Sequence, residues 1–143
     1  MYQYSVYLFK SDYALHFYYK IDIVYRFLYK QKLAGEGSDH KQYQSVLDKV
    51  NRDDLLSHLN LWVDDGVSIE AKKNQLMIER SSQKIYVHIA DYAITILADS
   101  IVDLDGLLFQ YIKTFHPHIF AVNYETKECG WITPFAGKQI YLM

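Results

Sequence analysis

Four short runs of alternating apolar and polar residues follow one another between residues 67 and 97. This period of two is typical of β-strands that bury one face. Polar turns separate the runs, at Lys73-Asn74, at Ser81-Ser82-Gln83 and at Ala90-Asp91. Because turns this short join antiparallel neighbours, we expect a meander of four strands at about 67–72, 75–80, 84–89 and 92–97.

An aromatic helix is predicted ahead of this meander. A strand-like run at residues 4–9 gives way, after Ser11 and Asp12, to apolar residues at helical spacing. The spacings of 4, 4, 3 and 4 residues indicate one continuous helix from Tyr13 to about Leu33, which the loop sequence Gly35-Glu36-Gly37-Ser38 ends. The residues on its regular face are Tyr13, Phe17, Ile21, Val24 and Leu28.

Three further helices are predicted from apolar stripes and capping residues. The second runs from about Asp39 to Val50, and the third opens at an Asn51 cap with Asp54 three residues later. A fourth begins near Ser100 and Asp103 and ends at His116-Pro117. Two closing strands follow, at residues 118–124 and up to Trp131-Ile132.

The resulting order, β-ααα-ββββ-α-ββ, predicts an α+β fold with one mostly antiparallel sheet and helices packed on it. The 143 residues show no repeat, no low-complexity segment and no boundary between domains, so we expect residues 1–143 to form a single domain. Regular faces place in its core Tyr4, Phe9, Val24, Leu28, Tyr111, Phe115 and Trp131.

The composition is rich in tyrosine. Aromatic residues make up 16% of the chain, with 14 Tyr, 7 Phe and 2 Trp. Because a buried tyrosine needs a partner for its hydroxyl, many of these rings are expected at the core boundary or on a contact surface. The net charge of −2 argues against a protein that coats nucleic acid through general basicity.

No pattern of reactive residues indicates an enzyme. The six histidines are dispersed apart from His116-Pro117-His118, and no metal-binding motif accompanies them. Cys129 is the single cysteine, which excludes an intramolecular disulfide, and it lies in a predicted strand without a feature that would activate its thiol. Paired aspartates fall at helix ends, where capping explains them. We therefore expect no catalysis, metal or cofactor.

The sequence also bears on cellular location. It shows no charged-then-apolar leader and no apolar stretch near the roughly 18 residues of a membrane span. A reduced cytoplasm is therefore the expected location.

The start of the first helix is the candidate recognition surface. Tyr13 and Phe17 lie one turn apart near the Ser11 cap, a spacing that suits an anchor in a partner's pocket. The same spacing also suits ordinary core residues. A third interpretation is nucleic-acid stacking, because Lys20, Arg26 and Lys30 lie among the tyrosines. The residue pattern leaves these three open.

Two segments, one near each end of the chain, carry a recognisable pattern. The opening segment carries Tyr7-Leu8-Phe9-Lys10, Asp12-Tyr13-Ala14 and His16-Phe17-Tyr18. The closing segment carries Ile119-Phe120-Ala121-Val122-Asn123-Tyr124 and Gly130-Trp131-Ile132-Thr133-Pro134, similar to a strand pair that ends in G-W-x-x-P. In this order, both ends of the chain resemble the SirA family, the sporulation inhibitor of replication.

The resemblance implies a regulator that binds domain I of the bacterial initiator DnaA and restrains replication as cells commit to sporulation. It implies partner contacts at Tyr13 and Phe17, with His16 between them and a polar contact near Lys49 in the second helix. At the first aromatic position the family can carry Phe where this chain has Tyr13, and at the second it can carry Tyr where this chain has Phe17. Each difference keeps a ring but moves a hydroxyl. An adaptor of the same fold that acts on another protein stays open, and the oligomeric state is not indicated.

Overall fold

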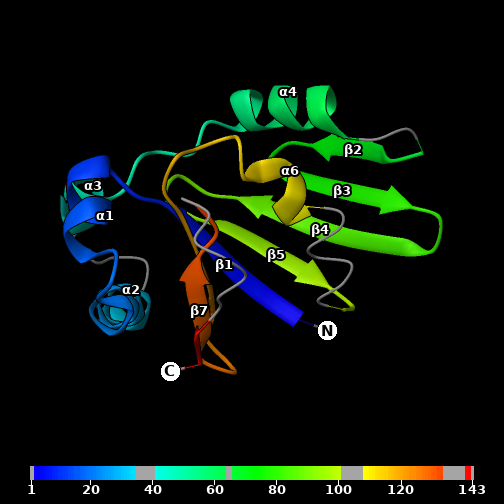
Figure 1. The fold of residues 1–143 in the computed structure, drawn as a ribbon. Helices are drawn as coiled ribbons and strands as arrows, with labels where there is room; N and C mark the ends of the chain where they lie inside the picture. The colour runs from blue at the N-terminus through cyan, green and yellow to red at the C-terminus, as the bar shows by residue number, and fades with distance from the viewer. Residues whose placement is uncertain (1, 35–40, 64–65, 101–107, 134–140, 143) are drawn as a thin grey trace.

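One antiparallel sheet of eight strands organises the computed structural model, which describes residues 2–34, 41–63, 66–100, 108–133 and 141–142 (Figure 1). Its strand order is β2-β3-β4-β5-β1-β6-β7-β8. The strands are β1 (Tyr2–Leu8), β2 (Ser68–Lys72), β3 (Gln75–Arg80), β4 (Gln83–Ile89), β5 (Ile94–Ala98), β6 (Ile119–Asn123), β7 (Glu128–Trp131) and β8 (Tyr141–Leu142). The helices are α1 (Ser11–Phe17), α2 (Ile21–Ala34), α3 (Lys41–Val46), α4 (Arg52–Trp62) and α6 (Gln110–Ile112).

The predicted α+β class and the antiparallel meander are both confirmed. Strands β2 to β5 are successive neighbours, and Lys73 and Ser81 adopt positive φ in the two tight turns. The first strand of the chain then inserts between β5 and β6, so that Val6 lies opposite both Ile94 and Ala121. The N-terminal strand therefore occupies the middle of the sheet.

Two cores lie on opposite faces of the sheet. The aliphatic core lies against α4 and α6 and includes Val6, Leu8, Leu55, Leu59, Ile78, Ile85, Val87, Ile96, Ile112 and Ile119. The aromatic core lies against α1, α2 and α3 and consists of Tyr7, Phe9, Ala14, Val24, Tyr25, Leu28, Leu47, Phe120, Val122, Cys129 and Trp131. The alternation of side chains along a strand separates the two sets.

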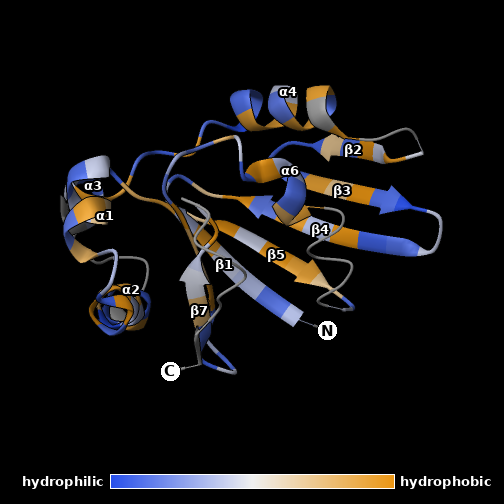
Figure 2. Cartoon of the chain, in the orientation of Figure 1, coloured by the Kyte–Doolittle hydropathy of each residue, from blue (hydrophilic) through white to orange (hydrophobic). Residues whose placement is uncertain are grey.

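Both faces of the sheet are covered at β6, whereas only one face is covered at β4 (Figures 1 and 2). In β6 every residue is buried, with Ile119 and Ala121 in the aliphatic core and Phe120 and Val122 in the aromatic core. Strand β4 instead alternates buried and exposed residues, as expected of a strand with one covered face. We call the bare side of β2–β4 the open face; its exposed residues include Glu70, Tyr86 and His88.

Most of the expected core residues are buried, namely Tyr4, Phe9, Val24, Leu28, Tyr111 and Trp131. Phe115 is only partly buried, at the border of the aliphatic core. The predicted Asn51 cap is confirmed, because its side-chain Oδ1 accepts a hydrogen bond of 3.0 Å from the Asp54 backbone N–H. The cap satisfies one of the free amides at the start of α4.

The prediction of one continuous helix from Tyr13 to Leu33 is wrong. The chain leaves helical structure after Phe17 and resumes it at Ile21, and Figure 1 shows α2 end-on where α1 is seen from the side. In a continuous helix the Tyr18 carbonyl would accept from the amide four residues later. Here it accepts a hydrogen bond of 3.0 Å from the Trp131 indole N–H. At the corner between α1 and α2, a hydrogen bond from β7 to the Tyr18 carbonyl thus takes the place of a hydrogen bond within a helix.

The second predicted helix is also shorter than expected. Residues 39–40 lie outside the described residues, and α3 ends at Val46 instead of Val50. Beyond that point the chain turns toward β1: Leu47 forms a β-bridge with Phe9, and the Asp48 amide donates to the Leu8 carbonyl at 2.7 Å. Pairing with the sheet replaces the last helical turn, so Lys49 is not on a helix.

The predicted fourth helix is described only in part. Its start, with Asp103, falls among residues 101–107, outside the described residues. Its described part is the short helix α6, which ends before His116-Pro117. Strand β8 was not predicted, because two residues carry no period. Cys129 pairs with Tyr141 in the register of β7 and β8.

Candidate protein-binding surface

Tyr13 and Phe17 form the outer layer of the aromatic core. The Tyr13 ring stacks on Phe9 at a centroid distance of 5.4 Å and lies 4.5 Å from the Phe17 ring and 6.0 Å from Phe27. Both Tyr13 and Phe17 are half-buried. Burial raises the pKa of the Tyr13 hydroxyl, which therefore stays protonated at neutral pH. Each ring is held from behind by core residues and presents its other side to solvent.

Trp131 fixes this layer to the sheet. Its ring lies 5.3 Å from Phe9 and 5.0 Å from Phe120, both in edge-to-face geometry, and stacks on Tyr18 at 5.8 Å. Edge-to-face and offset-stacked pairs are the favoured arrangements of aromatic rings. The rings of α1 are therefore positioned by a rigid support.

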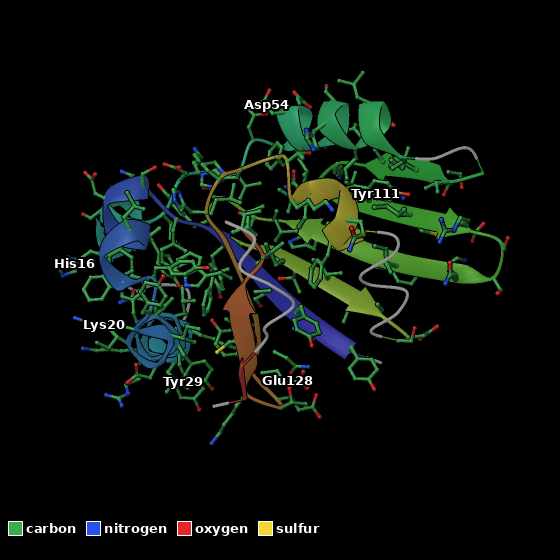
Figure 3. The ribbon with its side chains drawn as sticks, viewed as in Figure 1. His16, Lys20, Tyr29, Asp54, Tyr111 and Glu128 are labelled. Carbon is green, nitrogen blue, oxygen red and sulfur yellow. The ribbon has the colours of Figure 1, made fainter. Side chains whose placement is uncertain are left out.

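Two side chains flank Phe17 on the solvent side. The His16 ring meets the Phe17 ring edge-on at 4.6 Å, and the Lys20 ammonium lies 5.8 Å from the centre of the Phe17 ring. Both are exposed, and Figure 3 shows them projecting away from the sheet. We call Tyr13, His16, Phe17 and Lys20 the α1 patch. It combines two rigid rings with a polar rim, the composition of a protein-binding surface.

Further apolar side chains lie beside the α1 patch. Leu15 is 71% exposed and Tyr19 is 92% exposed, and Ile23 on α2 is also exposed. The sequence predicts extra rings around the helix, but not that Tyr19 is so exposed. Its exposure follows from the corner between α1 and α2, which turns it out of a helical position. Single exposed apolar residues are common, so these three do not by themselves extend the patch.

The start of α1 rests on the end of α3 and on the segment before β6. The Lys10 amide donates to the Val46 carbonyl at 2.8 Å, and Ser11 Oγ lies 3.5 Å from His118 Nδ1. His118 is buried, and its pKa is lowered by this burial and then by nearby His116, with Asp48 opposing the shift. A neutral His118 therefore underlies the first turn of α1 at neutral pH.

His116 is the link between His118 and Asp48. The His118 backbone N–H donates to His116 Nδ1 at 3.0 Å, so in the neutral ring the proton is assigned to Nε2. His116 Nε2 then donates to an Asp48 carboxylate oxygen at 2.8 Å. The two histidines that stand closest in sequence thus make hydrogen bonds that orient loops around α1.

A family model now adds to this geometry. The model of the sporulation inhibitor of replication protein SirA matches residues 2–136. The chain belongs to the SirA family. The match covers both ends, which carry the resemblance, and the stretch from 31 to 80 between them. A search among curated protein sequences gives no match.

Of the four candidate contacts, the structure brings Tyr13, His16 and Phe17 together, whereas Lys49 lies on another segment of the chain. Lys49 is exposed on the segment between α3 and α4. That segment passes the end of β1, since the Val50 amide donates to the Asp91 carbonyl at 2.8 Å and the Asp48 amide donates to Leu8. A partner that contacts both Lys49 and the α1 patch would therefore cover α1 and this segment.

Cys129 is fully buried in the aromatic core, and burial raises the pKa of its thiol to about 12. A thiol with so high a pKa is almost entirely protonated and a poor nucleophile. Within the described ranges, no three His, Cys, Asp or Glu residues are grouped where they could hold a metal ion.

None of the described helices combines the length and the apolar character needed to cross a membrane.

Proposed function

We propose that this SirA-family protein binds domain I of the replication initiator DnaA through the α1 patch and so inhibits the start of chromosome replication during sporulation. The family is described as a sporulation inhibitor of replication. The observation that carries the proposed site is the pair of half-exposed rings, Tyr13 and Phe17, supported from behind by Phe9 and Trp131.

Rigid support matters for affinity because binding then orders few side chains. Immobilising a flexible side chain costs about 0.5–1.5 kcal/mol on association. Tyr13 and Phe17 are already restricted by ring contacts at 5.4 Å and 4.5 Å. Their exposed edges can therefore fill a hydrophobic pocket at little further entropic cost, while His16 and Lys20 orient the partner as a polar rim.

Inhibition by this route needs occupancy alone. A protein seated on DnaA domain I covers a surface that the initiator uses for other contacts, which prevents those contacts by mass action. The mechanism requires no bond-breaking step, and it uses no nucleophile or cofactor.

The sharpest test compares substitutions in the α1 patch with matched substitutions on the open face. His16→Ala removes the polar neighbour of Phe17, and His88→Ala removes an exposed histidine on the open face as a matched control. A second pair is Phe17→Ala with Tyr86→Ala, an aromatic that is 44% exposed on the open face. Titration calorimetry with purified DnaA domain I measures affinity, and circular dichroism with urea unfolding verifies the fold.

We expect Phe17→Ala to weaken binding by about tenfold or more, as removal of an aromatic anchor does, and His16→Ala by a smaller factor. Tyr86→Ala and His88→Ala are expected to bind as the parent protein does. If the parent binds and the α1 variants bind equally well, the α1 patch is the wrong surface. If the parent protein itself does not bind domain I, the proposed partner is wrong.

The nucleic-acid alternative receives less support from the basic residues of α1 and α2. Arg26 pairs with Asp22 at 3.4 Å, Lys20 lies against the Phe17 ring, and Lys32 lies 4.1 Å from the centre of the Tyr124 ring. Binding to phosphates weakens steeply with salt. Retention on DNA that falls as salt rises, together with no binding to DnaA domain I at any salt concentration, would favour nucleic acid over the proposed partner.

A further inference from the structure

Strand β2 lies at one end of the sheet, with β3 beside it and no described strand on its other side. Its residues Ser68, Glu70, Ala71 and Lys72 are exposed, and Ile69 is half-buried. An unpaired edge of this kind offers backbone N–H and C=O groups to an added strand. The question is which strand fits it.

The direction of the free backbone groups follows from the hairpin. Lys72 pairs with Gln75 across the two-residue turn Lys73-Asn74, so the backbone groups of Lys72 point toward β3. Backbone direction alternates along a strand. Glu70 therefore also points toward β3, while Ile69 and Ala71 direct their N–H and C=O groups to the outer edge.

A second copy of β2 can pair with this edge in three symmetric antiparallel registers, centred on Ile69, Glu70 or Ala71. The register centred on Glu70 places two glutamates directly opposite each other, which is destabilising. The register centred on Ile69 pairs Glu70 with Ser68 and brings no charges together. The register centred on Ala71 places Glu70 opposite Lys72 of the second copy, and Lys72 opposite its Glu70.

The register centred on Ala71 also satisfies the backbone. The two Ala71 residues face each other as a hydrogen-bonded pair and exchange both N–H···O=C bonds. Glu70 and Lys72 then occupy the adjacent non-hydrogen-bonded positions, where side chains approach most closely. Both charged side chains lie on the open face, on the opposite side from α4 and α6.

We propose that two copies of this protein associate through β2, antiparallel about Ala71, with two Glu70–Lys72 ion pairs across the junction. A second copy is favoured over an unrelated strand because, in this register, Glu70 and Lys72 of β2 face Lys72 and Glu70 of the other copy. Strand β2 and the strands beneath α1 lie in different halves of the sheet. The dimer therefore leaves both α1 patches free, and one dimer presents two of them.

The dimer is tested on the full chain without any partner, so its outcome is independent of the proposed function. Analytical ultracentrifugation over a range of about 5 to 500 µM should show a weight-average mass that rises toward twice that of the monomer. The interface is small, and association is expected to be weak and reversible.

Ala71→Pro is the decisive single variant. It removes an N–H that points away from β3, so the β2–β3 ladder and the circular dichroism spectrum are kept while the dimer is lost. Ala71→Ser keeps this N–H and is the matched control, expected to associate as the parent protein does. A chain that is monomeric at every concentration, or a dimer that survives Ala71→Pro, would overturn the proposal.

Charge exchange tests the register. Lys72→Glu places like charges opposite each other and should weaken association about tenfold. The double variant Glu70→Lys with Lys72→Glu exchanges both partners of each pair and should restore it. In a register centred on Glu70 the double variant would still oppose two like charges, so failure of the rescue contradicts the register proposed.

Discussion

The two cores of this protein differ in composition and in how they end. The aliphatic core is made largely of Ile, Leu and Val between the sheet, α4 and α6, and its central residues Ile78, Ile85 and Ile96 are fully buried. The aromatic core is built from rings, and its outermost members, Tyr13 and Phe17, are half-exposed. Both cores end in partly buried residues. Those bordering the aliphatic core are mostly aliphatic, whereas those bordering the aromatic core are mostly rings and include two members of the α1 patch.

This contrast indicates that the proposed recognition surface is the outer layer of a core. A ring can be held by neighbours on one side and remain available on the other, because its flat shape makes favourable contacts at its face and at its edge. Aliphatic side chains lack this geometry. Substitutions in the aromatic core are therefore expected to affect both stability and binding, and those in the aliphatic core stability alone.

The largest expected effect comes from truncating one central residue of each core. Phe120→Ala should lower the free energy of unfolding by about 3–5 kcal/mol and Ile96→Ala by about 2–5 kcal/mol, as measured by urea denaturation. The amides of α1 and α2 should then exchange faster in Phe120→Ala than in Ile96→Ala. Equal rates in both variants would mean that truncation of either core destabilises α1 to the same extent.

Trp131→Phe is expected to have the next largest effect. It keeps a ring in the aromatic core but removes the N–H that donates to the Tyr18 carbonyl at 3.0 Å. We expect a loss of about 1–3 kcal/mol in unfolding free energy, with exchange accelerated at the corner between α1 and α2. A corner with unchanged protection would show that this hydrogen bond does not hold the break between the helices.

Acid should weaken the support of α1. The pKa of His118 in the folded protein lies below its ordinary value of 6.5, so the unfolded chain binds more protons in the range just below 6.5. Stability contributed by neutral His118 is therefore complete above that range and is lost as the pH falls through it. Urea unfolding at a series of pH values measures this slope.

His118→Asn should flatten the slope, because the titrating group is gone while a polar atom remains near Ser11 Oγ. His16→Ala is the control, since His16 is exposed and makes no contact with this cluster. A slope that His118→Asn leaves unchanged would assign the acid sensitivity to another group.

The thiol of Cys129 gives a probe of the aromatic core that needs no substitution. Because the side chain is fully exposed only after unfolding and burial raises its pKa to about 12, the native protein should react with a disulfide reagent at pH 8 far more slowly than the denatured chain. Fast reaction of the native protein would show that the aromatic core opens readily.

The smallest effect is expected at Tyr19, which is 92% exposed. Tyr19→Ser should change the unfolding free energy by no more than about 0.5 kcal/mol. A larger loss would show that its ring contact with Tyr18, at 4.9 Å, contributes to the aromatic core.

The elements that were predicted correctly depend on near neighbours in the chain. The meander from β2 to β5 follows from alternation and short turns, and the start of α4 follows from the Asn51 side chain and an amide three residues away. The neighbourhood of Tyr13, His16 and Phe17 could likewise be predicted, since positions three and four apart share a side of a helix.

What could not be predicted depends on distant residues. Trp131 takes the carbonyl of Tyr18, 113 positions earlier, and Leu47 leaves its helix to bridge Phe9. Helical periodicity continues through both places, so nothing in the local pattern indicates the breaks. Lys49 moves off its expected helix for the same reason.

The sequence alone determined the class of fold, the meander, the family and the candidate rings, because periodicity, capping and family pattern are written in adjacent residues. The tertiary structure decided which rings are supported and which are exposed. That outcome depends on the competition between a helical hydrogen bond and one from β7, and on which half of the sheet the helices cover.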